Sequence, residues 1–135
     1  MAETLEIIES YQKRALEDLK AAETMLNSKF HLAAISLAYY AVFYAITASL
    51  LKEGIIVHKH KQLGIEFRKN FIKTGQLDKK YSEILQQLFR SRQTADYDAI
   101  PNIPEEKVKD LIKDAKEFVE ILNKLDAGVR RHDVE

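Results

Sequence analysis

The most unusual segment of the chain is an uncharged stretch from residue 32 to residue 51, LAAISLAYYAVFYAITASLL, in a sequence where 31% of the residues are charged. Its length matches the roughly 20 apolar residues that a membrane span needs. However, it contains two serines, a threonine, three tyrosines and six alanines, whereas a bilayer span is richer in leucine, isoleucine and valine. A helix that is apolar on all sides can also lie among other helices. We therefore expect a buried core helix and no contact with a membrane.

The segments on either side of this stretch are amphipathic. In residues 4–27, for example, Leu5, Ile8 and Leu19 follow three- and four-residue steps, and charged residues occupy the positions between them. This spacing predicts α-helices, and no stretch shows the alternation of apolar and polar residues that is typical of a half-buried strand. The predicted helices span residues 4–27, 31–52, 59–73, 79–96 and 104–128.

Individual residues predict where these helices begin and end. Gly54, Gly75 and Gly128 follow apolar periodic segments, and glycine readily takes the left-handed conformation found after a helix C-terminus. Asp78 is a good N-cap for the fourth helix, and Pro104 is a favourable first residue for the last one. The joining loops are therefore short.

Together the elements predict an all-α fold, an up-and-down four- or five-helix bundle with the apolar second helix at its centre. The length of 135 residues fits one domain, which we assign to residues 1–128. Residues 129–135 form a short basic tail that is a candidate for disorder.

Composition excludes several kinds of chemistry. The chain has no cysteine, so disulfides, thiol nucleophiles and cysteine-bound zinc are excluded. His58 and His60 are two positions apart with no third ligand nearby in the sequence, so we expect no metal site and no cofactor. The first residues, with three glutamates among them, do not resemble a secretory signal, and we expect a cytoplasmic protein.

The overall formal charge is zero, but the charge is unevenly distributed. Residues 52–80 contain eight basic and three acidic side chains, a net charge of +5 that the rest of the chain balances. Such a basic region can attract phosphates or an acidic partner. It is equally compatible with a short helix whose lysines are simply solvated.

The end of the fourth predicted helix collects polar residues just before a proline-containing loop. Arg92 and Asp96 are four apart and share a helix face, where an exposed ion pair is worth about 0.5 kcal/mol. If Arg92 instead continues the apolar stripe of Leu85 and Leu88, its guanidinium is partly buried and needs a carboxylate or a phosphate. Arg90 is two residues from Arg92 and points elsewhere.

Three motifs resemble a known family. They are Tyr-Tyr-Ala-Val-Phe at residues 39–43, Lys-His-Lys at residues 59–61 with Phe67 after it, and Arg-Gln-Thr-Ala-Asp-Tyr-Asp at residues 92–98. In this order and spacing they resemble the HEPN domain (higher eukaryotes and prokaryotes nucleotide-binding), and more narrowly its small stand-alone prokaryotic members. The resemblance extends from the first helix to about Leu125.

The resemblance implies an all-α bundle that forms a homodimer and works with a minimal nucleotidyltransferase as a toxin–antitoxin-like module. Many HEPN proteins are metal-independent ribonucleases with an Arg followed, after four to six residues, by a His. Here the His is missing: counted from Arg92, its three possible positions hold Tyr97, Asp98 and Ala99. A tyrosine with a pKa near 10 is ionised only about one part in a thousand at neutral pH, so it is a poor general base.

The candidate residues follow from the motifs. Candidate catalytic residues are Arg92, Tyr97 and His60, and candidate nucleotide- or phosphate-binding residues are Arg92, Asp96, Tyr40, Arg90 and Lys61. In some HEPN toxins a tyrosine close to the signature accepts a nucleotide from the partner transferase, which for Tyr97 requires exposure.

Three functions remain open. The first is a nucleotide- or RNA-binding protein with weak or no nuclease activity. The second is a metal-independent ribonuclease in which His60 or Tyr97 replaces the missing base, and the third is a structural or adaptor bundle in which Arg92 and Asp96 form an internal ion pair.

Overall fold

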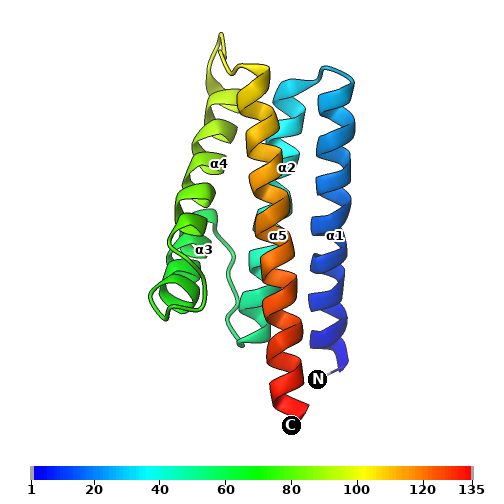
Figure 1. The fold of residues 1–135 in the computed structure, drawn as a ribbon, viewed down its shortest axis with the longest axis vertical. Helices are drawn as coiled ribbons and strands as arrows, with labels where there is room; N and C mark the ends of the chain where they lie inside the picture. The colour runs from blue at the N-terminus through cyan, green and yellow to red at the C-terminus, as the bar shows by residue number, and fades with distance from the viewer. Residues whose placement is uncertain (1, 135) are drawn as a thin grey trace.

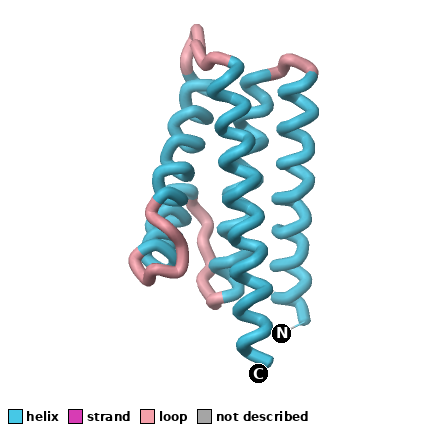
Figure 2. Tube along the Cα trace, in the orientation of Figure 1, coloured by secondary structure: helices cyan, strands magenta, loops and turns pink. Residues whose placement is uncertain are grey.

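Four long helices stand side by side in the computed structural model, which describes residues 2–134 and the side chains of residues 2–126 (Figure 1). They are α1 (Ala2–Asn27), α2 (His31–Lys52), α4 (Lys80–Tyr97) and α5 (Glu105–Val134). A short helix, α3 (His60–Phe67), continues directly into one turn of π-helix, η1 (Arg68–Ile72), and lies across the lower end of α4. Neighbours in sequence run in opposite directions, and the described residues contain no strand (Figure 2). The predicted all-α up-and-down bundle is confirmed.

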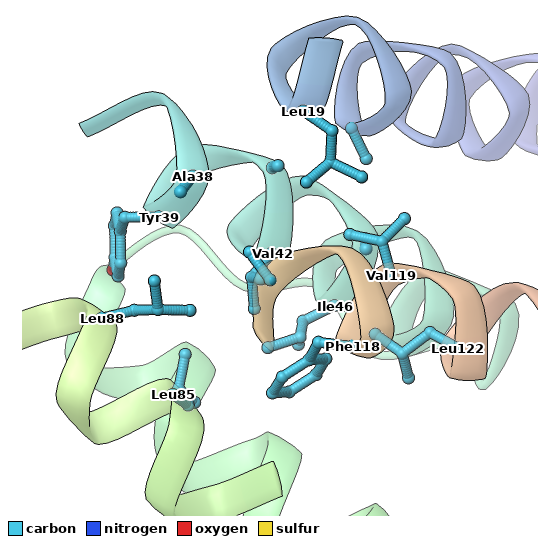
Figure 3. Close-up of a cluster of buried hydrophobic side chains, with 14 of the residues drawn as sticks. Leu19, Ala38, Tyr39, Val42, Ile46, Leu85, Leu88, Phe118, Val119 and Leu122 are labelled. Atoms are coloured by element: carbon cyan, nitrogen blue, oxygen red, sulfur yellow. The ribbon is translucent and has the colours of Figure 1, made fainter. Parts of the chain in front are cut away.

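The uncharged segment forms α2, which lies in the middle of the bundle. By length and composition α2 could cross a bilayer, but 67% of its most apolar window is buried inside the molecule. Side chains from α1, α4 and α5 cover it, as the core cluster around Val42, Ile46, Leu88 and Phe118 shows (Figure 3). A core helix with neighbours on most sides explains its composition without a membrane.

Small residues set the distance between α1 and α2. Ala15 and Ala22 of α1 are fully buried, as are Ala34, Ala38 and Ala41 of α2. Alanine at these positions lets the two helix backbones approach closely, while larger side chains such as Leu19 fill the remaining space. Five of the six alanines that argue against a bilayer span, all except the exposed Ala33, are therefore buried in the packing of the bundle.

The two buried polar side chains of α2, those of Thr47 and Ser49, both have hydrogen-bond partners. Thr47 Oγ1 donates a hydrogen bond to the backbone carbonyl of Phe43 at 2.8 Å. Ser49 Oγ donates to both carboxylate oxygens of Asp126 on α5, at 3.2 and 3.3 Å, and Gln12 Nε2 on α1 lies 3.4 Å from the same group. Because Asp126 is 5% exposed, these bonds offset its burial and connect α1, α2 and α5.

Two helix ends that the sequence predicts are confirmed. Gly54 has φ +79°, and the amides of Gly54 and Ile55 donate to the carbonyls of Leu51 and Leu50, both at 2.9 Å, which is the Schellman arrangement. Asp78 Oδ1 accepts a hydrogen bond of 2.8 Å from the amide of Lys80, so it caps the first turn of α4.

Other predicted boundaries are corrected. The third helix changes to π-helical geometry at Arg68, which periodicity does not reveal. The last helix does not end at Gly128: α5 extends to Val134, through most of the expected tail, although the side chains of this end lie outside the described part. A glycine inside a helix costs about 1 kcal/mol relative to alanine, but that alone does not end it.

Gly54→Ala tests the left-handed end of α2. Within the described part of the chain, nothing lies within 4 Å of a Cβ built at Gly54, so the added methyl group meets no described neighbour and backbone strain is the expected cost. We expect the free energy of unfolding to fall by about 1 kcal/mol in urea denaturation. Gly54→Asn should recover much of that loss, because asparagine tolerates this conformation. Equal stability of wild type and Gly54→Ala would contradict the assignment.

Candidate functional site

Arg92 lies at the junction of α4 and α2. It continues the stripe of Leu85 and Leu88, both buried, and its own side chain is only 17% exposed. Its guanidinium carbon lies 5.3 Å from the ring centre of Tyr39 and 5.1 Å from that of Tyr40. The alternative of a partly buried guanidinium on the inner stripe is therefore the one observed, with the charge held against two aromatic rings.

The ion pair between Arg92 and Asp96 is geometrically poor. Arg92 Nε lies 3.2 Å from Asp96 Oδ2, yet its N–H is not directed at that oxygen, and the buried Nε has no hydrogen-bond partner among the described residues. Asp96 also accepts a hydrogen bond of 3.2 Å from Ser36 Oγ on α2. The carboxylate, one third exposed, thus balances the charge without fully satisfying the guanidinium.

His60, the first residue of α3, reaches the same rings. Its imidazole stacks on Tyr39 with centroids 5.7 Å apart and lies 4.5 Å from the centroid of Phe43 and 6.0 Å from that of Tyr40. Burial, and secondarily the positive charge of Arg92, lower the pKa of His60 below its ordinary value of 6.5. The sequence alone gives no reason to expect His60 near Arg92. The fold places both side chains against the rings of Tyr39 and Tyr40.

Tyr39 connects the core to this cluster and was not among the predicted site residues. It is 2% exposed, and burial, which outweighs the lowering effect of Arg92, raises its pKa to about 12. Its hydroxyl lies 2.7 Å from His60 Nδ1. The signal in the sequence is its place in the Tyr-Tyr motif, where only Tyr40 is predicted as a site residue.

The hydrogen bond between Tyr39 and His60 allows two tautomers. If the hydroxyl donates to Nδ1, the neutral imidazole carries its proton on Nε2 and can donate to a phosphate. If Nδ1–H donates to the hydroxyl oxygen, Nε2 is an acceptor and can take a proton as a base. The two tautomers therefore correspond to a binding role and a catalytic role for the same side chain.

A second group of aromatic and basic side chains continues from Tyr40 along α2 towards α1. The ring of Tyr44 lies 6.1 Å from that of Tyr40, and Tyr11 stacks on Tyr44 at 5.8 Å. Arg14 lies over Tyr44 at 4.1 Å and donates a hydrogen bond of 2.7 Å to its hydroxyl. Tyr11 and Arg14 are not predicted from the sequence, because their positions on α1 are typical of a solvated helix face.

The remaining predicted residues lie away from the rings. Tyr97 is 75% exposed at the end of α4, and Arg90 is exposed on the same helix with no recorded contact to the cluster. Lys61 is exposed next to His60 and lines a neighbouring pocket. Within the described residues, no three His, Asp or Glu side chains are grouped as metal ligands. The structure thus gathers Arg92, Asp96, Tyr40 and His60.

The lowered pKa of His60 predicts how stability depends on pH. Below about pH 6.5 the unfolded chain binds a proton that the folded protein resists, so the free energy of unfolding falls as the pH falls. His60→Gln should remove this component, and wild type should lose stability relative to the variant between about pH 7 and about pH 5. Urea denaturation across this range measures the difference.

His58→Gln is the matched control, because His58 is exposed and forms no hydrogen bond, ion pair or ring contact with the described residues. It should follow the wild-type pH dependence. Parallel curves for wild type and His60→Gln would refute the link between His60 and stability.

Comparisons with known proteins agree with this architecture. The sequence model of the HEPN domain matches residues 8–125. A protein of Thermotoga maritima named "UPF0332 protein" is 36% identical over 132 residues, which cover 97% of this chain and 99% of the relative. Two proteins of Methanocaldococcus jannaschii carry the name "Putative toxin": one is 39% identical over 80% of this chain and 79% of its own length, and the other is 29% identical over 88% of both.

The family match includes all or most of each of the five helices, and with them the junction where Arg92, Tyr40 and His60 meet. The resemblance inferred from three short motifs is thereby confirmed over nearly the whole chain. This protein belongs to the HEPN domain family.

Proposed function

We propose that this HEPN protein binds the phosphate of RNA or of a nucleotide through Arg92, with Tyr40, Asp96 and His60 around it, and that its nuclease activity is weak or absent. The observation that carries the proposal is the convergence of Arg92 and His60, from different helices, on the rings of Tyr39 and Tyr40. A cation held beside aromatic faces suits a phosphate and its adjoining base.

The electrostatics of Arg92 support a phosphate as ligand. The pairing of Arg92 with Asp96 lacks good hydrogen-bond geometry. An anion whose oxygens are better placed therefore binds the guanidinium more strongly than the Asp96 carboxylate does. Asp96 is one third exposed and can turn towards solvent when a phosphate arrives. Tyr44 and Arg14 extend the same surface for a longer strand.

The toxin-like character of the family supports a role in a two-protein module. We propose a homodimer as the working form and a minimal nucleotidyltransferase as partner, as the family resemblance implies, acting in the cytoplasm. The name of two relatives, "Putative toxin", is consistent with such a module. Tyr97, 75% exposed, meets the exposure condition for accepting a nucleotide from that partner.

Arg92→Ala tests the binding proposal. With a mixed RNA pool in EDTA, we expect wild type to retain RNA and the variant to bind at least about tenfold more weakly, a loss of about 1.4 kcal/mol. Filter retention at two salt concentrations measures it, and Lys116→Ala, which removes an exposed charge on α5, should match wild type.

Arg90→Ala distinguishes a specific RNA-binding site at Arg92 from general electrostatic attraction of RNA to the protein. Since Arg90 is exposed and outside the cluster, its loss should weaken retention less than the loss of Arg92. Equal effects of the two arginines would contradict a site at Arg92. If wild type neither retained nor cleaved RNA, the structural or adaptor bundle would be favoured, with Arg92 and Asp96 as an internal ion pair.

A second candidate function is a metal-independent ribonuclease with His60 as base. It is favoured by the lowered pKa of His60, which keeps the imidazole neutral at neutral pH, and by the Tyr39 hydroxyl that holds the ring in place. Arg92 would then stabilise the charge that develops on the phosphate.

In this case cleavage in EDTA should rise with pH through a pKa below 6.5 and then level off. His60→Gln should abolish that cleavage, and Tyr97→Phe should preserve it. Single-turnover rates on a labelled RNA supply the profile. Cleavage that survives His60→Gln but is lost in Tyr97→Phe would assign the base to Tyr97 instead.

A further inference from the structure

A pocket of about 420 Å³ opens between α3 and α4, beside His60. We call it the α3–α4 pocket; it is lined by Tyr39, His60, Lys61, Gly64, Arg68 and Phe89, together with Gln86 and aliphatic side chains. This volume is within the range of about 300–1,000 Å³ that is typical of small-molecule sites. Arg92 is not part of its lining.

The charge of the α3–α4 pocket is positive and unbalanced. None of its lining residues is acidic, and within the described residues neither Lys61 nor Arg68 forms an ion pair. Arg68 is half-buried, so part of its charge is withdrawn from water. An anion entering the pocket would meet two cations and no carboxylate.

Arg68 is held in position by its surroundings. Its Nε donates a hydrogen bond of 2.8 Å to Ser82 Oγ on α4, which leaves the two terminal nitrogens for another acceptor. One of them lies so close to Gly64 that a Cβ built there would be 2.9 Å away. Arg68 also begins the π-helical turn η1, a distortion that often occurs at functional positions.

The floor of the pocket is apolar. Leu63 and Leu85 are buried beneath it, Phe89 contributes an aromatic ring, and Ile65 remains 54% exposed at its edge. An inorganic ion would leave this surface in water, whereas a ligand with a flat hydrocarbon or aromatic body would cover it. The size, the positive charge and the apolar floor of the pocket therefore favour a small anion with an apolar body.

We propose that the α3–α4 pocket binds a small organic phosphate, with its phosphate on Arg68 and Lys61 and its apolar body on Leu85, Phe89 and Ile65. This site is additional to the RNA or nucleotide contact at Arg92, and it stands whether or not that contact exists. Because Tyr39 and His60 line the pocket, a bound ligand touches the hydrogen-bonded pair that faces Arg92.

Calorimetric titration with 1-naphthyl phosphate tests the proposal. We expect saturable one-to-one binding of 1-naphthyl phosphate. Inorganic phosphate lacks the apolar body and uncharged 1-naphthol lacks the phosphate, so each should bind at least about tenfold more weakly. Arg68→Gln should weaken binding of 1-naphthyl phosphate at least about tenfold. Lys69→Gln, an exposed lysine of the same segment that does not line the pocket, should leave it unchanged.

A second variant separates loss of binding from loss of folding. Gly64→Ala keeps every charge but displaces the end of Arg68, a flexible group, and should weaken binding while the thermal unfolding midpoint stays near that of wild type. The proposal is overturned if inorganic phosphate binds as tightly as 1-naphthyl phosphate, or if Lys69→Gln is as damaging as Arg68→Gln. It is also overturned if binding is lost in Arg92→Ala and retained in Arg68→Gln.

Discussion

The constraint on which the structure depends is the burial of α2 by its neighbours. A helix without a charge over 20 residues cannot face water on any side without cost, so α1, α4 and α5 each supply an apolar face to it. Close approach on the α1 side is achieved with alanines, and bulkier residues such as Phe118 fill the opposite side. The arrangement leaves α3 at the edge, where its first residue reaches the aromatic end of the α2 surface.

The candidate site exists because α2 is also aromatic. Tyr39, Tyr40 and Tyr44 extend from the core to the surface, and two arginines from different helices lie on their rings. The rings exclude water from one side of each guanidinium, which strengthens any interaction with an anion on the other. The proposed binding of an anion thus depends on the same helix that organises the core.

Much of the fold could be predicted from the sequence, and less of the site. The bounds of α2 and the capping of the first turn of α4 by the Asp78 carboxylate follow from local chemistry, and the structure has both. The π-helical turn at Arg68 and the continuation of α5 past Gly128 depend on packing that periodicity does not encode. The burial of Arg92 was one of two predicted alternatives, whereas its proximity to His60 and the role of Tyr39 required the three-dimensional arrangement.

Tyr39 belongs both to the hydrophobic core and to the candidate site at the surface. Its ring packs against Phe89 and Phe43 inside the bundle, while its hydroxyl fixes the orientation of His60 at the edge. A change of volume at a neighbouring core position would tilt the phenol and move the imidazole with it. A substitution in the interior of this bundle that looks conservative for stability can therefore still change the orientation of His60 at the surface.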